Sequence, residues 1–193
     1  MAEPAAVSAP AALATPFVPA PRPTDLDGRA LGVLDTGDED SCRFLDLLVA
    51  RLEKRHFLSA VVRISKPSDQ QPCPIPLLQQ LAEECDVVVT GVCATVDSAE
   101  CASLDAVSLE RLLVPCAVVV TAETRGRLEV RGYDDSTSIE LPRNPHADTD
   151  DVQALVEGSF REIERVLTVA RGPGQQRQPG AISPHGGEVT CEC

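Results

Sequence analysis

The chain has 193 residues and a net charge of −13 at pH 7, and it is 43% hydrophobic but only 3% aromatic. Nucleic-acid binding needs clustered Lys and Arg with aromatic side chains for base stacking, so this composition argues against a nucleic-acid partner. No apolar run reaches the ~18–20 residues of a membrane span, and Glu3 and several prolines stand where a secretory signal would be basic and then apolar. We therefore predict a soluble cytoplasmic protein that binds neither nucleic acid nor a membrane.

Two ends of biased composition flank a single predicted domain. Residues 1–23 contain eight Ala and six Pro, and residues 172–193 are rich in Gly and Pro. Neither end can bury enough side chain to offset its ordering entropy, so we expect flexible tails around one α/β domain at 24–171. The second tail ends in Cys191-Glu-Cys193, where a redox or metal hook with His185 is the less favoured alternative, because a zinc site needs about four ligands on an ordered frame.

Apolar runs of strand length alternate with segments of helical spacing along this domain. The predicted strands and helices, in chain order, are 30–35, 40–55, 60–65, 77–85, 86–92, 97–113, 116–121 and 148–170. The helix after the third strand is expected to open at Asp97 or Ser98, with Glu100 completing a capping box. Between 123 and 144, two alternating segments form either a hairpin or a helix followed by an edge strand, and we favour a strand at 138–141.

Near-continuous Val, Ile and Leu in the predicted strands indicates strands covered on both faces. The predicted fold is thus three-layer α/β, a mostly parallel sheet of flavodoxin-like or Rossmann-like order 2-1-3-4-5 with helices on both sides. Ligands of such sheets bind at the loops that leave the carboxyl ends of the strands. Neither G-x-G-x-x-G nor G-x-x-x-x-G-K-[ST] occurs, so we predict no nucleotide cofactor and no other cofactor.

Five short motifs occur in a fixed order along the domain. They are Pro21-Arg-Pro23, Gly32-Val-Leu-Asp35-x-Gly37, Val61-Val62-Arg63-x-x-Lys66-Pro67, Asp86-Val-Val-Val-x-Gly91-Val92 and Asp105-Ala-Val-x-Leu109-Glu-x-x-x-x-Pro115. Together they resemble the UGSC family of small bacterial proteins, over residues 17–170. That family carries a selenocysteine-Gly-Ser-Cys or Cys-Gly-Ser-Cys motif between the third strand and the next helix, and the resemblance implies thiol or selenol redox chemistry there.

The chain departs from the family at this motif, where it reads Thr95-Val96-Asp97-Ser98. A hydroxyl cannot form a disulfide, so the dithiol cycle that the resemblance implies is absent at these positions. Cys93 and Cys101 are the nearest thiols, and each is either a replacement nucleophile or a buried structural residue, as we expect for most cysteines of the core. Thr95 and Ser98 are either nucleophiles or, more commonly, loop and cap residues, because a hydroxyl nucleophile needs a general base.

Lys66 follows the second strand, where an ammonium can hold a carboxylate, form a Schiff base, or make a surface salt bridge to Asp35 or Asp38. Asp35 is a ligand group or a turn residue before Gly37. His146 is the candidate general base on a distant loop, whereas we expect His56, at the other end of the sheet, to be a solvated surface residue.

The sequence thus predicts one site at the carboxyl edge of the sheet, without a metal. The candidate catalytic residues are Lys66, Cys93, Thr95, Asp97, Ser98 and Cys101, and the candidate substrate-binding residues are Asp35, Gly37, Gly91, Glu123 and His146. The leading hypothesis is a small-molecule enzyme or enzyme subunit of UGSC-like type in sulfur-linked specialised metabolism. The alternative is a non-catalytic binding or accessory protein that forms a homodimer or docks on an intact relative.

Overall fold

The structure, a computed structural model, describes residues 18–125, 137–142, 145 and 149–168. Its elements, in chain order, are β1 (Ala30–Asp35), α1 (Glu39–Arg55), β2 (Ala60–Ser65), α2 (Ile75–Glu84), β3 (Val87–Cys93), α3 (Val96–Arg111), β4 (Cys116–Thr121), α4 (Ala122–Arg125), β5 (Ser138–Leu141) and α5 (Thr149–Thr168). The five strands form one parallel sheet in the order β2-β1-β3-β4-β5. The predicted fold class and strand order are confirmed.

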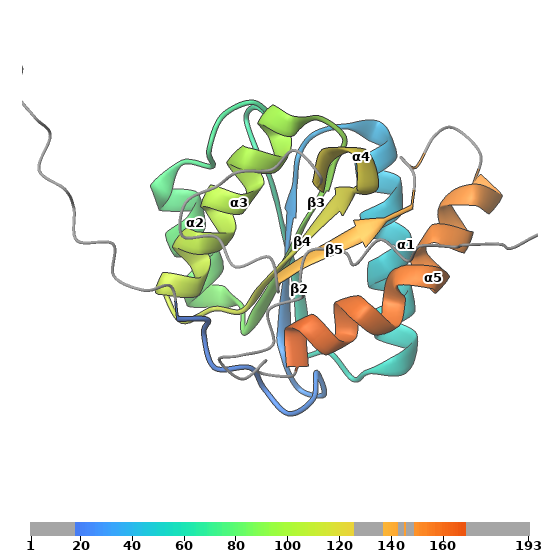
Figure 1. The fold of residues 1–193 in the computed structure, drawn as a ribbon. Helices are drawn as coiled ribbons and strands as arrows, with labels where there is room; N and C mark the ends of the chain where they lie inside the picture. The colour runs from blue at the N-terminus through green and yellow to red at the C-terminus, as the bar shows by residue number, and fades with distance from the viewer. Residues whose placement is uncertain (1–17, 126–136, 143–144, 146–148, 169–193) are drawn as a thin grey trace, which may run out of the picture.

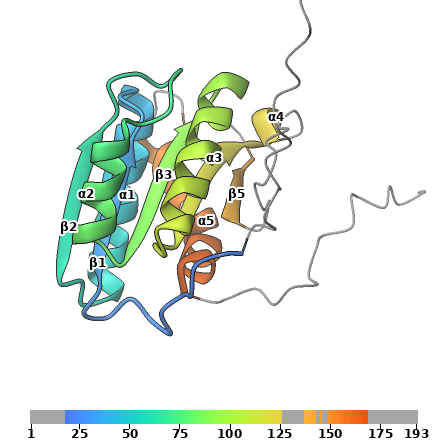
Figure 2. The same ribbon diagram turned by 90° about the vertical axis from the view of Figure 1, so that its left-hand side faces the viewer.

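Helices cover both faces of the sheet, with α1 and α5 on one side and α2 and α3 on the other (Figure 1). Every residue of β1, β3 and β4 is buried, as expected for central strands between two helical layers, whereas β2 at one edge is largely exposed. Figure 2 looks onto the face that α2 and α3 cover, with β2 at one side and β5 at the other. In the described part of the chain, no helix combines the length and apolarity needed to cross a membrane.

The start of α3 differs from the sequence prediction. The N-cap is Thr95, not Asp97 or Ser98, and the capping box joins Thr95 to Ser98 without Glu100. The Ser98 hydroxyl makes the reciprocal hydrogen bond that Glu or Gln more often makes at the third helical position. The search for a Glu at that position is why the sequence placed the helix start two or three residues too late. The edge strand at 138–141 is confirmed as β5, parallel to β4, while 127–131 lies outside the described residues.

The residues before β1 cross the amino end of the sheet, opposite α4 (Figure 1). Ala20 and Leu26 of this N-terminal segment (residues 18–29) are buried, although the first six of its residues were assigned to a tail by composition. The expectation for His56, at the end of α1, was wrong: its side chain is only 12% exposed and lies 2.7 Å from Glu164 of α5. An edge residue of a helix is solvated only where no other element packs over it, and here both α5 and the N-terminal segment do.

Candidate functional site

The carboxyl ends of three strands bring the first candidate residues together. Asp35 at the end of β1 lies opposite Ser65 of β2 and Gly91 of β3. The Lys66 amide donates to the Asp35 carbonyl oxygen at 2.9 Å, which extends the β1–β2 pairing by one residue. Cys93 is the last residue of β3, and burial raises the pKa of its thiol while the nearby charge of Lys66 partly offsets that rise. Asp35, Lys66 and Cys93 therefore share one edge, as parallel strands require.

Lys66 makes a buried ion pair with Asp105 of α3. The Nζ atom lies 2.7 Å from Asp105 Oδ2, and the side chains are 0% and 1% exposed. Asp105 Oδ1 accepts a second hydrogen bond, from the Cys73 amide at 2.7 Å. Burial raises the pKa of Asp105, although the hydrogen bond and charge of Lys66 and the Cys73 amide oppose that shift. The predicted surface bridge to Asp35 or Asp38 is wrong, because the lysine side chain runs inward beneath α3.

Asp35 is instead bonded within its own turn. One carboxylate oxygen accepts from the Gly37 amide at 2.5 Å, and the other accepts from the Ser65 hydroxyl at 3.1 Å. Gly37 has φ +83°, a left-handed conformation that suits glycine, and Asp38 then caps α1 through the Ser41 amide. The carboxylate of Asp35 thus shapes the loop that leads from β1 into α1.

A break in strand alternation orients Cys93. Val88 packs on the α2/α3 side of the sheet, and Cys93 is five residues later, so strict alternation would direct Cys93 to the opposite face. The β3–β4 register shifts between Thr90 and Cys93, and Cys93 consequently packs on the α2/α3 side with Val92 on the other. Gly91 lies at the shift with φ +127°, and a Cβ there would be 2.4 Å from the Val119 carbonyl oxygen.

The thiols near the ion pair are protonated at neutral pH. Burial raises the pKa of fully buried Cys93 to about 12, an increase that Lys66 and Ser98 only partly offset. Cys101, 9% exposed, also has a raised pKa because of its burial, again opposed by Lys66. Burial and the charge of Asp105 raise the pKa of Cys73 to about 11. A reactive cysteine carries a lowered pKa, so none of these three thiols is activated in this state.

Thr95 and Ser98, the two hydroxyl residues of the predicted motif segment, lie at the start of α3. The Thr95 hydroxyl accepts from the Ser98 amide at 3.2 Å, the Ser98 hydroxyl lies 3.3 Å from the Thr95 amide, and the two hydroxyl oxygens are 3.0 Å apart. The two side chains thus satisfy backbone groups at the helix start and contact each other. Comparison with protein-family models matches residues 2–169 to the UGSC family.

The chain belongs to the UGSC family. No curated protein matches it. Thr95 and Ser98, the two positions at which the sequence resemblance places the chalcogen-bearing residues of the motif, are in contact at the carboxyl edge of the sheet. Among the described residues, no three His, Cys, Asp or Glu side chains are arranged to hold a metal ion.

The other candidates lie further out. Asp97 is exposed in the first turn of α3, and Glu123 is exposed in the short helix α4. His146 lies outside the described residues. The structure therefore groups Asp35, Lys66, Cys93 and the Thr95–Ser98 pair around the carboxyl ends of β1, β2 and β3.

Two buried hydroxyls of this UGSC chain have no hydrogen-bond partner among the described residues. One is the Oγ1 atom of Thr36, the residue directly after β1, and the other is the Oγ1 atom of Thr90 in β3. Thr90 is two residues after Val88, so its side chain lies on the same α2/α3 side of the sheet. A buried hydroxyl without a partner costs about 1–3 kcal/mol, so each marks a place where a water or a polar ligand atom would be stabilised.

The sequence did not single out Asp105 as a site residue, although Asp105 begins one of the five motifs that resemble the UGSC family. Asp105 lies on the buried stripe of α3, three residues after Ala102 and four before Leu109. A carboxylate on an apolar helical stripe needs a buried partner, and Lys66 is one of only two lysines in the chain. A buried carboxylate and a rare lysine are the two sequence features from which the Lys66–Asp105 pair could have been predicted.

Proposed function

We propose that this chain is a UGSC-family protein that has lost the dithiol chemistry of the family motif and acts as a non-catalytic binding or accessory subunit. The observation that carries the proposal is the use of Thr95 and Ser98 as a mutual cap for α3. Their hydroxyls have no path to a disulfide, and each is already engaged in holding the helix start.

The neighbouring side chains support the same proposal. Lys66 is neutralised by Asp105, and Asp35 holds its own turn. The Cys93 thiol has a pKa of about 12, so at neutral pH almost none of it is the nucleophilic thiolate. Lys66, Asp35 and Cys93 are therefore each engaged or buried.

Restoring the motif sulfurs tests the loss of chemistry. The variant Thr95→Cys with Ser98→Cys is expected to form a disulfide in a glutathione redox buffer, because the side-chain oxygens of these positions are 3.0 Å apart. Free thiols are counted by alkylation and mass spectrometry, with the single variant Thr95→Cys as the control that has no partner at position 98. The wild-type chain is expected not to accelerate reduction of oxidised glutathione by dithiothreitol. Acceleration by the wild-type chain would overturn the proposal.

The accessory role predicts association. The chain is expected to form a homodimer or to co-sediment with an intact UGSC relative carrying Cys at both motif positions, and Thr95→Cys with Ser98→Cys should leave that association unchanged. Sedimentation velocity of the chain alone and mixed with that relative measures both. A monomer that sediments independently of the relative contradicts the accessory role.

A second function, a small-molecule enzyme of sulfur-linked metabolism, is favoured by one observation. Cys101 is 9% exposed, and the positive charge of Lys66 opposes the burial that raises the pKa of Cys101 and Cys93. An enzyme that uses either thiol should show one of them reacting with iodoacetamide at neutral pH well ahead of Cys73 and Cys85. Because burial raises the pKa of all four, we expect uniformly slow labelling instead.

A further inference from the structure

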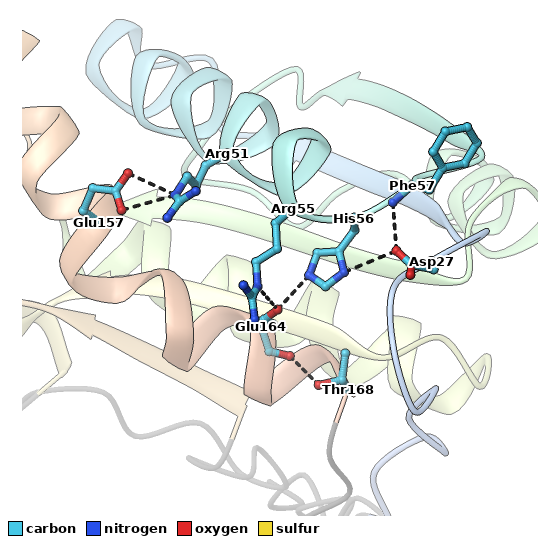
Figure 3. A network of polar contacts seen from close by, with 8 residues as sticks. All are labelled: Asp27, Arg51, Arg55, His56, Phe57, Glu157, Glu164 and Thr168. Carbon is cyan, nitrogen blue, oxygen red and sulfur yellow. Dashed lines mark hydrogen bonds and ion pairs between the residues drawn. The ribbon is translucent and has the colours of Figure 1, made fainter.

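His56 lies between two carboxylates that come from distant parts of the chain (Figure 3). Its Nε2 atom is 2.7 Å from Glu164 Oε1 of α5, and its Nδ1 atom is 3.6 Å from Asp27 Oδ1 of the N-terminal segment. The same Asp27 oxygen accepts the Phe57 amide at 2.8 Å. The imidazole thus connects the end of α1 to two other elements of the fold.

The charges around the ring are unequal. Arg55, the last residue of α1, places its Nε 2.7 Å from the same Glu164 oxygen, so Glu164 has two partners. Burial raises the pKa of Glu164, but its hydrogen bonds to Arg55 and His56 outweigh burial and lower it overall. Asp27, whose side chain is 65% exposed, contacts no arginine or lysine among the described residues and faces the ring from the N-terminal segment.

This asymmetry determines which ring nitrogen carries the hydrogen when the imidazole is neutral. The Glu164 carboxylate is ionised and can only accept, so the Nε2 atom that faces it carries a hydrogen. The Nδ1 atom, which faces Asp27, carries a hydrogen only when the ring is doubly protonated. A protonated ring therefore attracts Asp27, whereas a neutral ring turns its lone pair toward the Asp27 carboxylate.

We propose that His56 is a pH-sensitive clasp, which holds the N-terminal segment against the α1–β2 turn in acid and loosens it in alkali. Histidine is the side chain whose charge changes between pH 5 and 8. The residues the clasp governs include Gly28, whose amide donates to the Phe57 carbonyl oxygen at 2.7 Å. The other half of the segment is held independently by Arg22, which is paired with Glu110.

The clasp bears on a cavity at the amino end of the sheet. This cavity has a volume of about 380 Å³, and the N-terminal segment supplies Pro21, Arg22, Pro23 and Arg29 to its wall. Loosening between Asp27 and His56 frees the part of the segment next to Arg29. Access to this cavity, at the opposite end of the sheet from the UGSC motif, is therefore expected to increase as the pH rises.

Amide hydrogen exchange of the full chain at pH 5.5 and pH 8.5 tests the clasp. After correction for intrinsic exchange and for the protection of the core amide of Leu45, the protection of the Gly28 amide is expected to fall by about two- to fivefold at the higher pH, the range that a partly exposed ion pair supports. His56→Gln should remove this pH dependence, since glutamine does not titrate. The double variant His146→Gln with His185→Gln is the matched control and should retain it.

A second variant keeps the test decisive if His56→Gln unfolds. Asp27→Asn removes the segment's charge at an exposed position and should also flatten the pH profile, with the core protection of Leu45 intact. An unchanged Gly28 protection between the two pH values in the wild-type chain overturns the proposal. So does a pH dependence that persists in Asp27→Asn.

Discussion

Lys66 and Asp105 form an ion pair that water does not reach, and this determines how each can be changed. Removing one partner of a buried pair leaves an uncompensated charge, whereas replacing both by apolar residues of similar size is often neutral. Asp105 also accepts a hydrogen bond from the Cys73 amide, so it fixes the end of the loop before α2 as well as the lysine. The pair therefore holds the carboxyl end of β2 and the loop before α2 against α3.

Asp105→Asn is expected to lower the free energy of unfolding by about 3–5 kcal/mol, because it strands the Lys66 ammonium without its counter-charge. Lys66→Met with Asp105→Leu should recover most of this loss. Urea unfolding followed by circular dichroism measures all three proteins. Asp46→Asn is the matched control: it breaks an exposed pair with Arg63 and should cost no more than about 1 kcal/mol. If Asp105→Asn and Asp46→Asn lower the free energy of unfolding equally, the buried pair contributes no more to stability than the exposed one.

For single residues, the sequence predicted where Lys66 and Asp35 lie but not what they contact. The end of a parallel strand can be read from an apolar run, so both residues were placed at the correct edge of the sheet. The partner of Lys66 depends on the rotation of α3 about its axis, which no local pattern encodes. Asp35 was given two roles, and its bond to Gly37 is the one the turn geometry requires.

Among the elements, β3 depends most on a single residue. Gly91 permits the register shift that turns Cys93 toward α3, since any side chain there meets the Val119 backbone. Alternation alone would have assigned Cys93 to the other face. The sequence could not predict this, because an irregular glycine in a buried strand looks the same as a regular one until the neighbouring strand is in place.

Gly91→Ala is expected to destabilise the domain by several kcal/mol, about the 1–3 kcal/mol of backbone strain plus the cost of a backbone clash. Gly158→Ala in α5 is the matched control. It meets no atom within 4 Å, and it should stabilise the helix by about 0.5–1 kcal/mol. Thermal unfolding of both variants gives the comparison. A Gly91→Ala protein as stable as wild type would show that β3 can regain its regular register, and Cys93 would then be expected to change faces.

The end of α3 stores strain of a different kind. Leu113 has φ +67°, and its amide and that of Val114 bond the Glu110 and Leu109 carbonyl oxygens, which completes a Schellman motif with leucine where glycine is usual. An L-residue in this conformation costs about 1–2 kcal/mol. The Leu113 side chain is exposed, so little packing offsets that cost.

Leu113→Gly is therefore expected to raise the free energy of unfolding by about 1 kcal/mol, even though it deletes a hydrophobic side chain. Leu113→Ala keeps the Cβ atom and should give little of this gain. Chemical denaturation of the two variants separates relief of backbone strain from loss of the leucine. A loss of stability in Leu113→Gly would mean that the exposed side chain makes a contact worth more than the strain.

Across the whole molecule, the layers could be predicted because they follow from periodicity, and the strand order because 2-1-3-4-5 is one of the common orders of doubly wound parallel sheets. The N-terminal segment could not, since its Ala and Pro content is typical of a tail. Arg22 attaches this segment to the domain. Its guanidinium donates to both Glu110 carboxylate oxygens, at 2.7 and 2.5 Å, and to the Val166 carbonyl oxygen of α5 at 3.2 Å. Glu110 in turn accepts the amides of Ala20 and Cys116.

One buried pair thus joins the N-terminal segment, α3, β4 and α5, and its loss should be felt across the domain. Arg22→Met is expected to lower the free energy of unfolding by about 3–5 kcal/mol, because the Glu110 carboxylate remains buried without its cation. The variant should also be cleaved faster by trypsin after Arg29, the last residue of the N-terminal segment, because the segment is then less firmly held against the domain. Arg29→Met, which breaks an exposed pair with Asp86, is the stability control and should cost no more than about 1 kcal/mol. If Arg22→Met unfolds at the same urea concentration as wild type, the segment is not an integral part of the domain, and the Pro21-Arg-Pro23 motif has another role.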